Sequence, residues 1–413
     1  MPRRVLIPRR PWRGRRVVLG VAGGIAAYKS VQLARDLTRL GCEVDVILTE
    51  GARRFVQPLS FEGVTGRPVH TDLFATDGAA LHIRLGQEAE AVVVAPATAD
   101  LIARVAQGRA DDLLTTTLLA TRAPVVLCPA MNTAMWEHPQ TQSNIQHVKE
   151  VLGIWVAGPD EGPLAHGEHG GAGRLLEPDD IVEHVGRALT PASTLTGARV
   201  LVTAGPTREP LDPVRYLGNR SSGKMGYALA QAAWRRGAQV TLISGPSALS
   251  DPVGVEVERV ERAADMLACA ARHAPDADLL VFAAAVADYR PAAVHPRKLK
   301  RELGPPVVTT EENPDVAAEV GSLRKKGSMA IGFALETNDL ETNAERKLAR
   351  KGFDWIVANP AGEPGAGIEA DANRAVLIAA DGSRESLPLQ SKQELADVIL
   401  DRVTSRRGPE PAE

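Results

Sequence analysis

The chain has few of the features of an extracellular, membrane or nucleic-acid-binding protein. Its three cysteines, Cys42, Cys128 and Cys269, form no CxxC pair and no paired framework, which argues against a disulfide scaffold. No apolar run reaches the ~18 residues that a membrane span needs. A net charge of −3 favours neither a nucleic-acid partner nor a membrane surface. We therefore expect a cytoplasmic enzyme, with no nucleic acid and no membrane as partner.

The length of the chain predicts two domains. A chain of 413 residues is long for one α/β domain, and two domains of about 200 residues each are expected. Residues 1–15 are Arg-rich and lack acidic residues, as in a transit peptide or a nucleic-acid arm. Their Pro-Arg breaks and lack of serine favour a disordered extension instead. The small, polar stretch at 190–197 predicts a linker, and residues 406–413 are expected to be a tail.

Residues 16–189 predict a doubly wound, Rossmann-like α/β domain. From Arg16 the pattern runs strand, glycine turn, amphipathic helix, glycine and strand, which is a βαβ unit with parallel strands. Further apolar strands are predicted at 91–95, 125–128 and 154–157, with helix-like stretches between them. Ligands in such sheets bind beyond the carboxyl ends of the strands.

Three loops at predicted strand ends should therefore meet at one site. A glycine pair before a helix is weak evidence by itself, because many such turns are only tight connections and this one lacks the spacing G-x-G-x-x-G. The candidate residues are Gly23, Gly24 and Ile25 after the first strand, Pro96, Ala97 and Thr98 after the strand at 91–95, and Pro129 to Asn132 after the strand at 125–128.

Residues 198–405 predict a second doubly wound domain. A strand at 199–203 leads into a glycine-rich loop that ends at Gly226, followed by a helix at 224–236 and a strand at 239–244. Glycines in the loop permit positive φ and close backbone approach, while the start of the helix favours an anion. Ser221, Ser222 and Lys224 would add donors, so an anionic ligand is expected here.

A P-loop is the first alternative for this stretch. Gly218 to Lys224 has the spacing G-x-x-x-x-G-K, but Met225 follows where a hydroxyl residue would bind magnesium. The preceding segment contains Pro213 and Arg215, which suit a buried strand poorly. A plain glycine-rich turn is the other alternative.

Further candidates follow a predicted strand at 278–288, which ends at Asp288. The basic stretch 296–302 is either a solvated charge run or a flap that grips a triphosphate through Lys298. Lys347 and Lys351 are four residues apart and share one face of a predicted helix. They are either ordinary surface lysines or partners of one nucleotide.

The motifs together resemble a known family over nearly the whole chain, the bifunctional phosphopantothenoylcysteine decarboxylase/phosphopantothenate–cysteine ligases. The ligase half is carried by GPTREPLDPVR, N-x-SSGKMG and AAVADYR, and the decarboxylase half by GGIAAYK, HIRLG, APATADLIARVAQGRADD and PAMN. The resemblance implies ligation of 4′-phosphopantothenate with cysteine in the second domain and decarboxylation to 4′-phosphopantetheine in the first. It also implies a homo-oligomer with dimeric ligase units, and possibly a dodecamer.

For the ligase, the resemblance implies activation by CTP, with Mg²⁺, through an acyl-cytidylate. Asn219 matches the residue that holds the acyl-cytidylate, Lys298 the flap lysine, and Asp288 the carboxylate that reads the cytosine amino group. No metal ligand is assigned. The remaining nucleotide contacts would be Asn313, Pro314, Asp315, Val316, Phe333, Lys347 and Lys351.

For the decarboxylase, the resemblance implies FMN bound at the three strand-end loops. His82 matches a histidine beside the flavin, although a lone histidine in sequence that looks like a strand is usually structural. Asn132 matches the residue that binds the substrate carboxylate.

Two positions depart from the family pattern. Ala22 replaces a hydroxyl residue before the glycine pair, and the lost donor should weaken FMN binding by about 1 kcal/mol if nothing replaces it. His166 stands where the family has a cysteine that acts as the final acid. Either His166 takes over that role or decarboxylation is impaired, which would leave a ligase fused to a flavin-binding or oligomerisation domain. A nucleotide-binding regulatory protein without catalysis is a further alternative.

Overall fold

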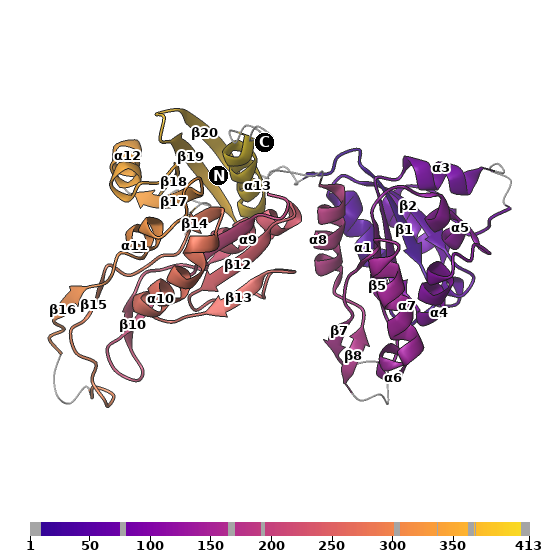
Figure 1. Ribbon diagram of the computed structural model, residues 1–413, viewed down its shortest axis with the longest axis horizontal. Coiled ribbons are helices and arrows are strands. Elements are labelled where there is room, and N and C mark those ends of the chain that lie inside the picture. Colours follow the sequence, from indigo (N-terminus) through magenta and orange to yellow (C-terminus); the bar gives the residue numbers. More distant parts are fainter. Residues whose placement is uncertain are drawn as a thin grey trace. The chain divides into compact units, whose positions relative to one another are not determined.

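The computed structural model describes residues 10–74, 80–163, 170–190, 195–300, 306–336, 338–361, 367 and 369–405. The chain divides into two compact units, residues 1–191 and 192–413, and each is described by itself (Figure 1). None of the helices in the described ranges combines the length and apolar character that a membrane span requires.

The first unit is built on a six-stranded parallel sheet in the order β3-β2-β1-β4-β5-β6. Arg16 pairs with Glu43 on one side of β1, and Val17 pairs with Ala91 on the other. The elements are β1 (Arg16–Val21), α1 (Ala27–Arg39), β2 (Glu43–Leu48), α2 (Pro58–Thr65), β3 (Val69–His70), α3 (Leu81–Glu88), β4 (Ala91–Ala97), α4 (Ala99–Ala106), α5 (Leu113–Ala120), β5 (Val125–Pro129), α6 (Thr133–Glu137), α7 (Pro139–Glu150), β6 (Trp155–Val156), β7 (Asp160–Gly162), β8 (Gly171–Arg174) and α8 (Pro178–Leu189).

Helices cover both faces of this sheet, so its central strands are continuous apolar runs. Residues 17–21 of β1 and all of β4 are buried. The helices α1, α2 and α8 pack on one face, and α3, α4, α5 and α7 pack on the other. In α1 the buried residues recur at helical spacing, from Ala27 to Leu37, so that one stripe of the helix meets the sheet.

The second unit repeats this topology and extends it. Its eight-stranded sheet has the order β13-β12-β9-β14-β17-β18-β19-β20, with parallel pairing from β13 to β18 and antiparallel pairing beyond. The elements are β9 (Arg199–Ala204), β10 (Arg208–Pro210), β11 (Tyr216–Gly218), α9 (Lys224–Arg235), β12 (Gln239–Ser244), β13 (Glu256–Arg259), α10 (Ala263–His273), β14 (Leu279–Phe282), β15 (Tyr289–Pro291), β16 (Thr310–Glu312), α11 (Val316–Ser322), β17 (Met329–Glu336), α12 (Leu340–Lys351), β18 (Trp355–Pro360), β19 (Ala372–Ala379), β20 (Arg384–Ser391) and α13 (Lys392–Ser405).

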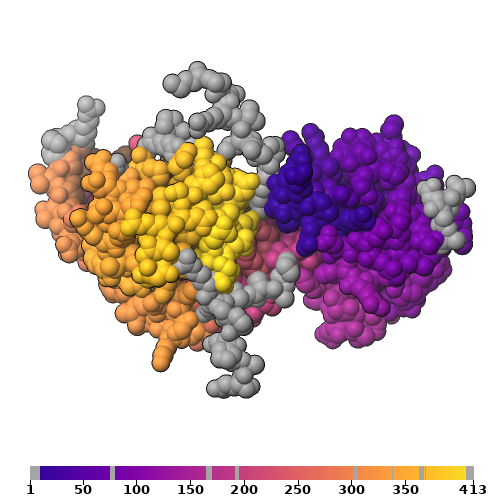
Figure 2. Space-filling view, turned by 90° about the horizontal axis from the view of Figure 1, so that it is seen from above, coloured from indigo at the N-terminus to yellow at the C-terminus, as the bar shows by residue number. Residues whose placement is uncertain are grey.

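The helices of the second unit also form two layers. The helices α9 and α13 pack on one face of the sheet, and α10, α11 and α12 pack on the other. The C-terminal segment, yellow in Figure 2, forms a continuous part of the surface of this unit. The small sheet of β15 and β16 extends away from the main sheet (Figure 1). The prediction of two doubly wound α/β domains is confirmed by this architecture.

The ends of the units differ from the sequence-based expectation. Residues 10–15, expected within a disordered extension, form turns in which Trp12 packs on the core beside α1 and Arg15 donates to the carbonyl of Leu189. Residues 1–9 and the expected tail lie outside the described residues. Of the expected linker, Leu195 is fully buried in the core of the second unit, so residues 195–197 belong to that unit.

One segment with a strand-like sequence and one predicted strand also differ from the structure. Residues 82–86 lie within the helix α3, because Leu81 and Leu85 are one helical turn apart and both face the core. The strand predicted at 278–288 is only Leu279–Phe282. Beyond it the backbone leaves the sheet, where the amide of Ala285 donates to Gly205 of the glycine-rich loop.

The start of α9 lies very close to the end of β9. A Cβ atom on Gly226 would be 2.4 Å from the Cβ atom of Ala204, and Gly223, just before the helix, has φ +79°. Glycine at 226 therefore lets the helix approach the strand that carries the glycine-rich loop.

We predict that Gly226→Ala lowers the free energy of unfolding of the second unit by about 1–3 kcal/mol, because the added methyl group forces α9 away from β9. Calorimetric unfolding of the full chain measures this. The control is Gly321→Ala in α11, where the nearest atom to an added Cβ is 3.9 Å away. Equal unfolding temperatures for the two variants would contradict the packing argument.

Two candidate ligand sites

The first candidate site is a cavity of about 650 Å³ at the edge of the first sheet where β1, β4 and β5 end. The three predicted loops do meet here, because Gly24, Thr98 and Asn132 all line the cavity. The helix after β1 and the helix after β4 pack on opposite faces of the sheet, which opens a crevice between the ends of these two strands. The lining residues are Gly23, Gly24, Ile25, Ala26, Tyr28, Lys29, Thr98, Ala99, Ala130, Met131, Asn132, Met135, Pro163, Gly173, Arg174 and Leu175.

The glycine turn in this cavity presents unpaired backbone donors. The helix α1 begins without a side-chain cap, and in the part of the chain that the structure describes no acceptor is found for the amides of Gly24, Ile25 and Ala26. A Cβ atom on Gly23 would lie 2.6 Å from the backbone of Gly51, so only glycine fits there. Free amides at the start of a helix suit a phosphate group, so the loop fits the phosphate of a flavin mononucleotide.

The asparagine of this site is held in one orientation. The Oδ1 atom of Asn132 accepts from the amide of Ala134 at 2.8 Å and caps α6. Because the oxygen is engaged in this cap, the Nδ2 group is the part of the side chain left to donate to a ligand. Asn132 can therefore bind a carboxylate.

Other residues predicted for this site lie elsewhere. Pro96 and Ala97 are buried at the end of β4 and do not line the cavity. The carbonyl of Pro96 accepts from the amide of Ala22, and that of Ala97 accepts from the amide of Ala130. These two hydrogen bonds link the three loops. His82 is in the first turn of α3 and does not line the cavity, and within the described residues its buried Nδ1 atom has no partner. His166 lies outside the described residues.

The second candidate site is a cavity of about 370 Å³ in the second unit. It lies beyond the ends of β14 and β17 and is closed by α11 and α12. Most of the residues predicted to contact a nucleotide line it together, although they come from four separate segments: Asp288, Asn313, Pro314, Asp315, Val316, Phe333, Lys347 and Lys351.

The two lysines of α12 are fixed by different partners. The Nζ atom of Lys347 donates to the carbonyl of Phe333 at 2.8 Å, and Lys351 donates to Oδ1 of Asp315 at 2.8 Å. Burial, together with the charge of Lys351, holds the pKa of Lys347 below its ordinary value. The same oxygen of Asp315 accepts from the amide of Ala318, so this carboxylate also caps α11. The lysines are therefore directed into the cavity region and are not free surface groups.

The segment that carries Asp288 is held by Asn313. The Nδ2 atom of Asn313 donates to Ala287 at 2.8 Å, and its backbone amide donates to the carbonyl of Asp288 at 2.9 Å. Arg290 pairs with Glu311 at 2.7 Å. The carboxylate of Asp288 is exposed at the cavity, where it can accept from an amino group of a base.

The residues expected to bind an anion at the glycine-rich loop make contacts within the protein. The hydroxyl groups of Ser221 and Ser222 accept from the amides of Gly223 and Lys224. The ammonium group of Lys224 lies 2.5 Å from Oδ1 of Asp371. The sequence predicted that Lys224 would bind an anionic ligand. In the structure it is paired with the carboxylate of Asp371 instead. The pair is exposed on the side of Asp371, where such ion pairs are weak.

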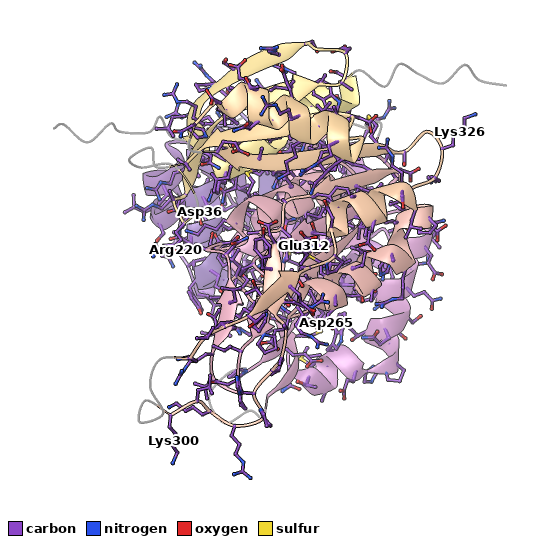
Figure 3. All side chains as sticks on the ribbon, turned by 90° about the vertical axis from the view of Figure 1, so that its left-hand side faces the viewer. Asp36, Arg220, Asp265, Lys300, Glu312 and Lys326 are labelled. Atoms are coloured by element: carbon purple, nitrogen blue, oxygen red, sulfur yellow. The ribbon has the colours of Figure 1, made fainter. Side chains whose placement is uncertain are left out.

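Asn219 and Lys298 do not line the second cavity. The Nδ2 atom of Asn219 donates to the carbonyl of Val286 at 2.8 Å, and Val286 does line it, so Asn219 adjoins the site. Lys298 is exposed in an extended segment, and Lys300 lies near the end of that segment (Figure 3).

The sequence analysis missed Asp212, which holds the Lys298 segment in place. The carboxylate of Asp212 is buried and accepts from the amides of Val214 and Arg215 and from that of Leu299. Burial opposes ionisation, but these backbone bonds outweigh it and keep the pKa of Asp212 low. Arg215 donates to the carbonyl of Leu299 as well. The sequence did contain an indication of this role, because an acidic residue stands between Leu211 and Pro213 in the motif GPTREPLDPVR.

Comparison with known proteins matches both units to described families. Residues 6–190 match the family described as Flavoprotein, and residues 195–406 match the DNA/pantothenate metabolism flavoprotein C-terminal domain. The Coenzyme A biosynthesis bifunctional protein CoaBC of Mycobacterium tuberculosis is 48% identical over 95% of this chain and 96% of its own. That of Escherichia coli is 44% identical over 95% of this chain and 97% of its own.

Solved structures match each unit separately. The crystal structure of the C-terminal domain of a coenzyme A biosynthesis bifunctional protein CoaBC is 40% identical and covers 52% of this chain and 98% of its own, with a TM-score of 0.45. The FMN-dependent cysteine decarboxylase SpaF is 34% identical and covers 38% of this chain and 89% of its own, with a TM-score of 0.35.

Fold and sites together define a two-domain α/β enzyme, with a flavoprotein unit followed by a unit whose charged cavity suits a nucleotide. The sequence identity of 48% and 44% to the two bifunctional proteins, over nearly their full length, then shows to which family the chain belongs. The chain belongs to the coenzyme A biosynthesis bifunctional proteins, which combine a phosphopantothenoylcysteine decarboxylase with a phosphopantothenate–cysteine ligase. The resemblance inferred from the motifs is confirmed.

We predict that Asp212→Asn releases the segment around Lys298, because an amide oxygen accepts more weakly from the three backbone donors than a carboxylate does. Hydrogen exchange at the amide of Leu299 should become roughly tenfold faster or more. Asp251→Asn is the control, since Asp251 pairs only with Arg259 in an exposed position. Unchanged exchange at Leu299 in Asp212→Asn would show that Asp212 does not hold this segment.

Proposed function

We propose that this enzyme joins 4′-phosphopantothenate to cysteine at the expense of CTP in its second unit, and decarboxylates the product to 4′-phosphopantetheine in its first unit. The observation that supports the nucleotide assignment most directly is the second cavity. Its walls contain the carboxylate, the asparagine and the two lysines that the motifs assigned to nucleotide contact. The flavoprotein unit, with its unpaired amides at α1, supports the second reaction.

The preference for CTP follows from the chemistry of the base. Cytosine carries an amino group that donates a hydrogen bond, and the carboxylate of Asp288 can only accept. Uracil presents an acceptor at the same place and would leave Asp288 facing a carbonyl oxygen. The lysines of α12 would supply positive charge for the triphosphate in the same cavity.

Magnesium is the second proposed component of the ligase site. The carboxylates of Asp288, Glu312 and Asp315 line the cavity and provide oxygen donors of the kind that Mg²⁺ prefers. Bound with the triphosphate, Mg²⁺ would supply charge neutralisation to the phosphates.

The ligation needs no nucleophile from the protein. The substrate carboxylate attacks the α-phosphate of CTP and pyrophosphate leaves, which gives the acyl-cytidylate. The cysteine amine then attacks the acyl carbon, loses a proton and releases CMP. The protein positions the groups and offsets the charge that develops on phosphate. In this scheme Asn219 donates to the acyl phosphate, and Lys298 approaches from its extended segment as a point charge.

In the first unit the amides of Gly24 to Ala26 would hold the phosphate of FMN, and Thr98 would line the same pocket. Bound FMN would supply the oxidation of the substrate thiol that makes loss of carbon dioxide possible. Asn132 would bind the substrate carboxylate through Nδ2, which its cap on α6 leaves directed at the ligand. We further assign His82 to the neighbourhood of the flavin, because α3 begins at the same edge of the sheet as the cavity.

A homo-oligomer with dimeric ligase units, possibly a dodecamer, and a location in the cytoplasm complete the proposal. Exposed apolar side chains on the β10–β11 and β15–β16 segments, including Tyr216, Leu217 and Tyr289, support association of ligase units. The free cysteines Cys42, Cys128 and Cys269 support a reducing compartment such as the cytoplasm.

A second candidate is an active ligase with an impaired decarboxylase. His166 in place of a cysteine acid favours it, as does Ala22, whose methyl group is buried and offers no donor to a phosphate. The two candidates differ only in the final product.

The purified protein, supplied with 4′-phosphopantothenate, cysteine, CTP and Mg²⁺, should form 4′-phosphopantetheine, pyrophosphate and CMP. An imidazolium can donate a proton as a thiol does, so His166→Asn should stop at an oxidised, decarboxylated product. Mass spectrometry of the products measures both. Accumulation of phosphopantothenoylcysteine by the wild-type enzyme would support the second candidate, and normal product from His166→Asn would exclude His166 as the donor.

Lys298→Gln should lower ligase kcat/KM by roughly 10- to 100-fold, because a charged contact to phosphate is lost. Asn219→Asp should lower it by about 100-fold or more, since a carboxylate would face an acyl phosphate. Decarboxylation of supplied phosphopantothenoylcysteine is the internal control and should keep its wild-type rate in both variants. Loss of both activities in a folded variant would contradict the assignment of the reactions to separate units.

A further inference from the structure

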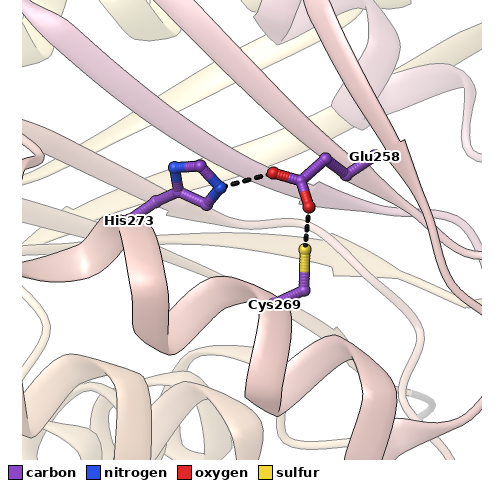
Figure 4. A group of neighbouring side chains, drawn as sticks. All are labelled: Glu258, Cys269 and His273. Atoms are coloured by element: carbon purple, nitrogen blue, oxygen red, sulfur yellow. Dashed lines mark hydrogen bonds and ion pairs between the residues drawn. The ribbon is translucent and has the colours of Figure 1, made fainter.

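The edge of the second sheet carries a group of side chains that neither cavity uses. Glu258 is on the edge strand β13, and Cys269 and His273 are on α10, which packs beside it (Figure 4). The Sγ atom of Cys269 lies 2.9 Å from Oε2 of Glu258, and Nε2 of His273 lies 2.5 Å from Oε1. In the part of the chain that the structure describes, no other set of three such residues is grouped closely enough to share a metal ion.

The arrangement suits a small divalent cation. Cys269 and His273 are four residues apart, so both project from one face of α10, and Glu258 faces them from the neighbouring strand. One potential ligand atom from each residue lies within 4.8 Å of the others. Zinc–ligand bonds of about 2.0–2.3 Å place neighbouring ligand atoms roughly 3–4 Å apart, so small side-chain movements would allow one ion to contact all three.

The types of ligand select the class of metal. A thiolate, an imidazole and a carboxylate are the three protein ligands that Zn²⁺ uses, whereas magnesium and calcium prefer oxygen alone. Cys269 is buried, while Glu258 and His273 are partly exposed, which gives an ion a path from solvent.

Arg272 is the competitor for this site. Its guanidinium group contacts Glu258 at 2.5 Å and the sulfur of Cys269 at 3.4 Å, so it occupies part of the space between the ligands. The side chain is 61% exposed and can turn into solvent when a cation arrives. An ion-pair cluster of Arg272 and His273 around Glu258 is the alternative that needs no metal.

We propose that Glu258, Cys269 and His273 form a binding site for Zn²⁺ or a cation of similar preference, with water as a fourth ligand. The ion would join the edge strand β13 to α10. Because none of these residues lines either cavity, the site is separate from the two reactions and independent of the proposed function.

The test is a titration of the tag-free, full-length protein with Cd²⁺, a zinc substitute whose bond to a thiolate absorbs in the ultraviolet. Difference spectra should show one thiolate–cadmium band per chain, which Cys269→Ser abolishes and the control Cys42→Ala retains. Zn²⁺ should displace Cd²⁺ and raise the unfolding temperature of the second unit in the wild type but not in His273→Gln. Arg272→Gln should tighten binding several-fold, because a competing positive charge is removed.

Absence of the band from the wild-type protein, or an equal band in Cys269→Ser, would overturn the proposal and leave the ion-pair cluster as the role of these side chains. Weaker binding in Arg272→Gln would equally contradict it, since the arginine would then be supporting the site.

Discussion

The divergence of the chain on the two sides of one central strand determines where the first site lies. In each sheet the chain first builds outward from the central strand, β1 or β9, and then returns to add β4 or β14 on its other side. The helices that follow the two neighbouring strands therefore pack on opposite faces of the sheet, and a crevice opens beyond the strand ends. The crevice follows from the topology, and the residues in the loops decide what it binds. The close contact between Gly226 and Ala204 shows how tightly this region is constrained in the second unit.

Sequence reasoning located the loops well because buried parallel strands are continuous apolar runs with glycines or polar residues directly beyond them. It failed where a residue's role depends on partners far away in the sequence. The sequence around His82 has apolar residues at both strand and helix spacing, and only packing on the core selects the helix. The chain leaves the sheet after Phe282, where the amide of Ala285 donates to the carbonyl of Gly205. No local sequence pattern reveals this contact. Asp212 was missed for the same reason, since one of its three amide partners is Leu299.

Charge in the nucleotide cavity is balanced before any ligand binds. Lys351 is paired with Asp315, and Lys347 is held against a carbonyl group with its pKa lowered by burial. A triphosphate would stabilise the charged form of Lys347, so binding of the anion and protonation of the lysine would favour each other. The pair with Asp315 keeps Lys351 in place at little cost, because the carboxylate is also tied to α11. Both lysines of α12 therefore have a partner within the protein.

The two units show how one topology supports different chemistry. In the first, the amides of Gly24 to Ala26, for which the described residues offer no acceptor, line the cavity together with Lys29, Arg174 and larger apolar side chains. In the second, the amides of Gly223 and Lys224 donate to the hydroxyl groups of Ser221 and Ser222, and the charged side chains of the cavity come from α12 and from the segment after β14. A backbone site depends on glycine, as at Gly23. A side-chain site depends on charge, and here the two lysines of α12 have a carbonyl or a carboxylate partner that fixes their position.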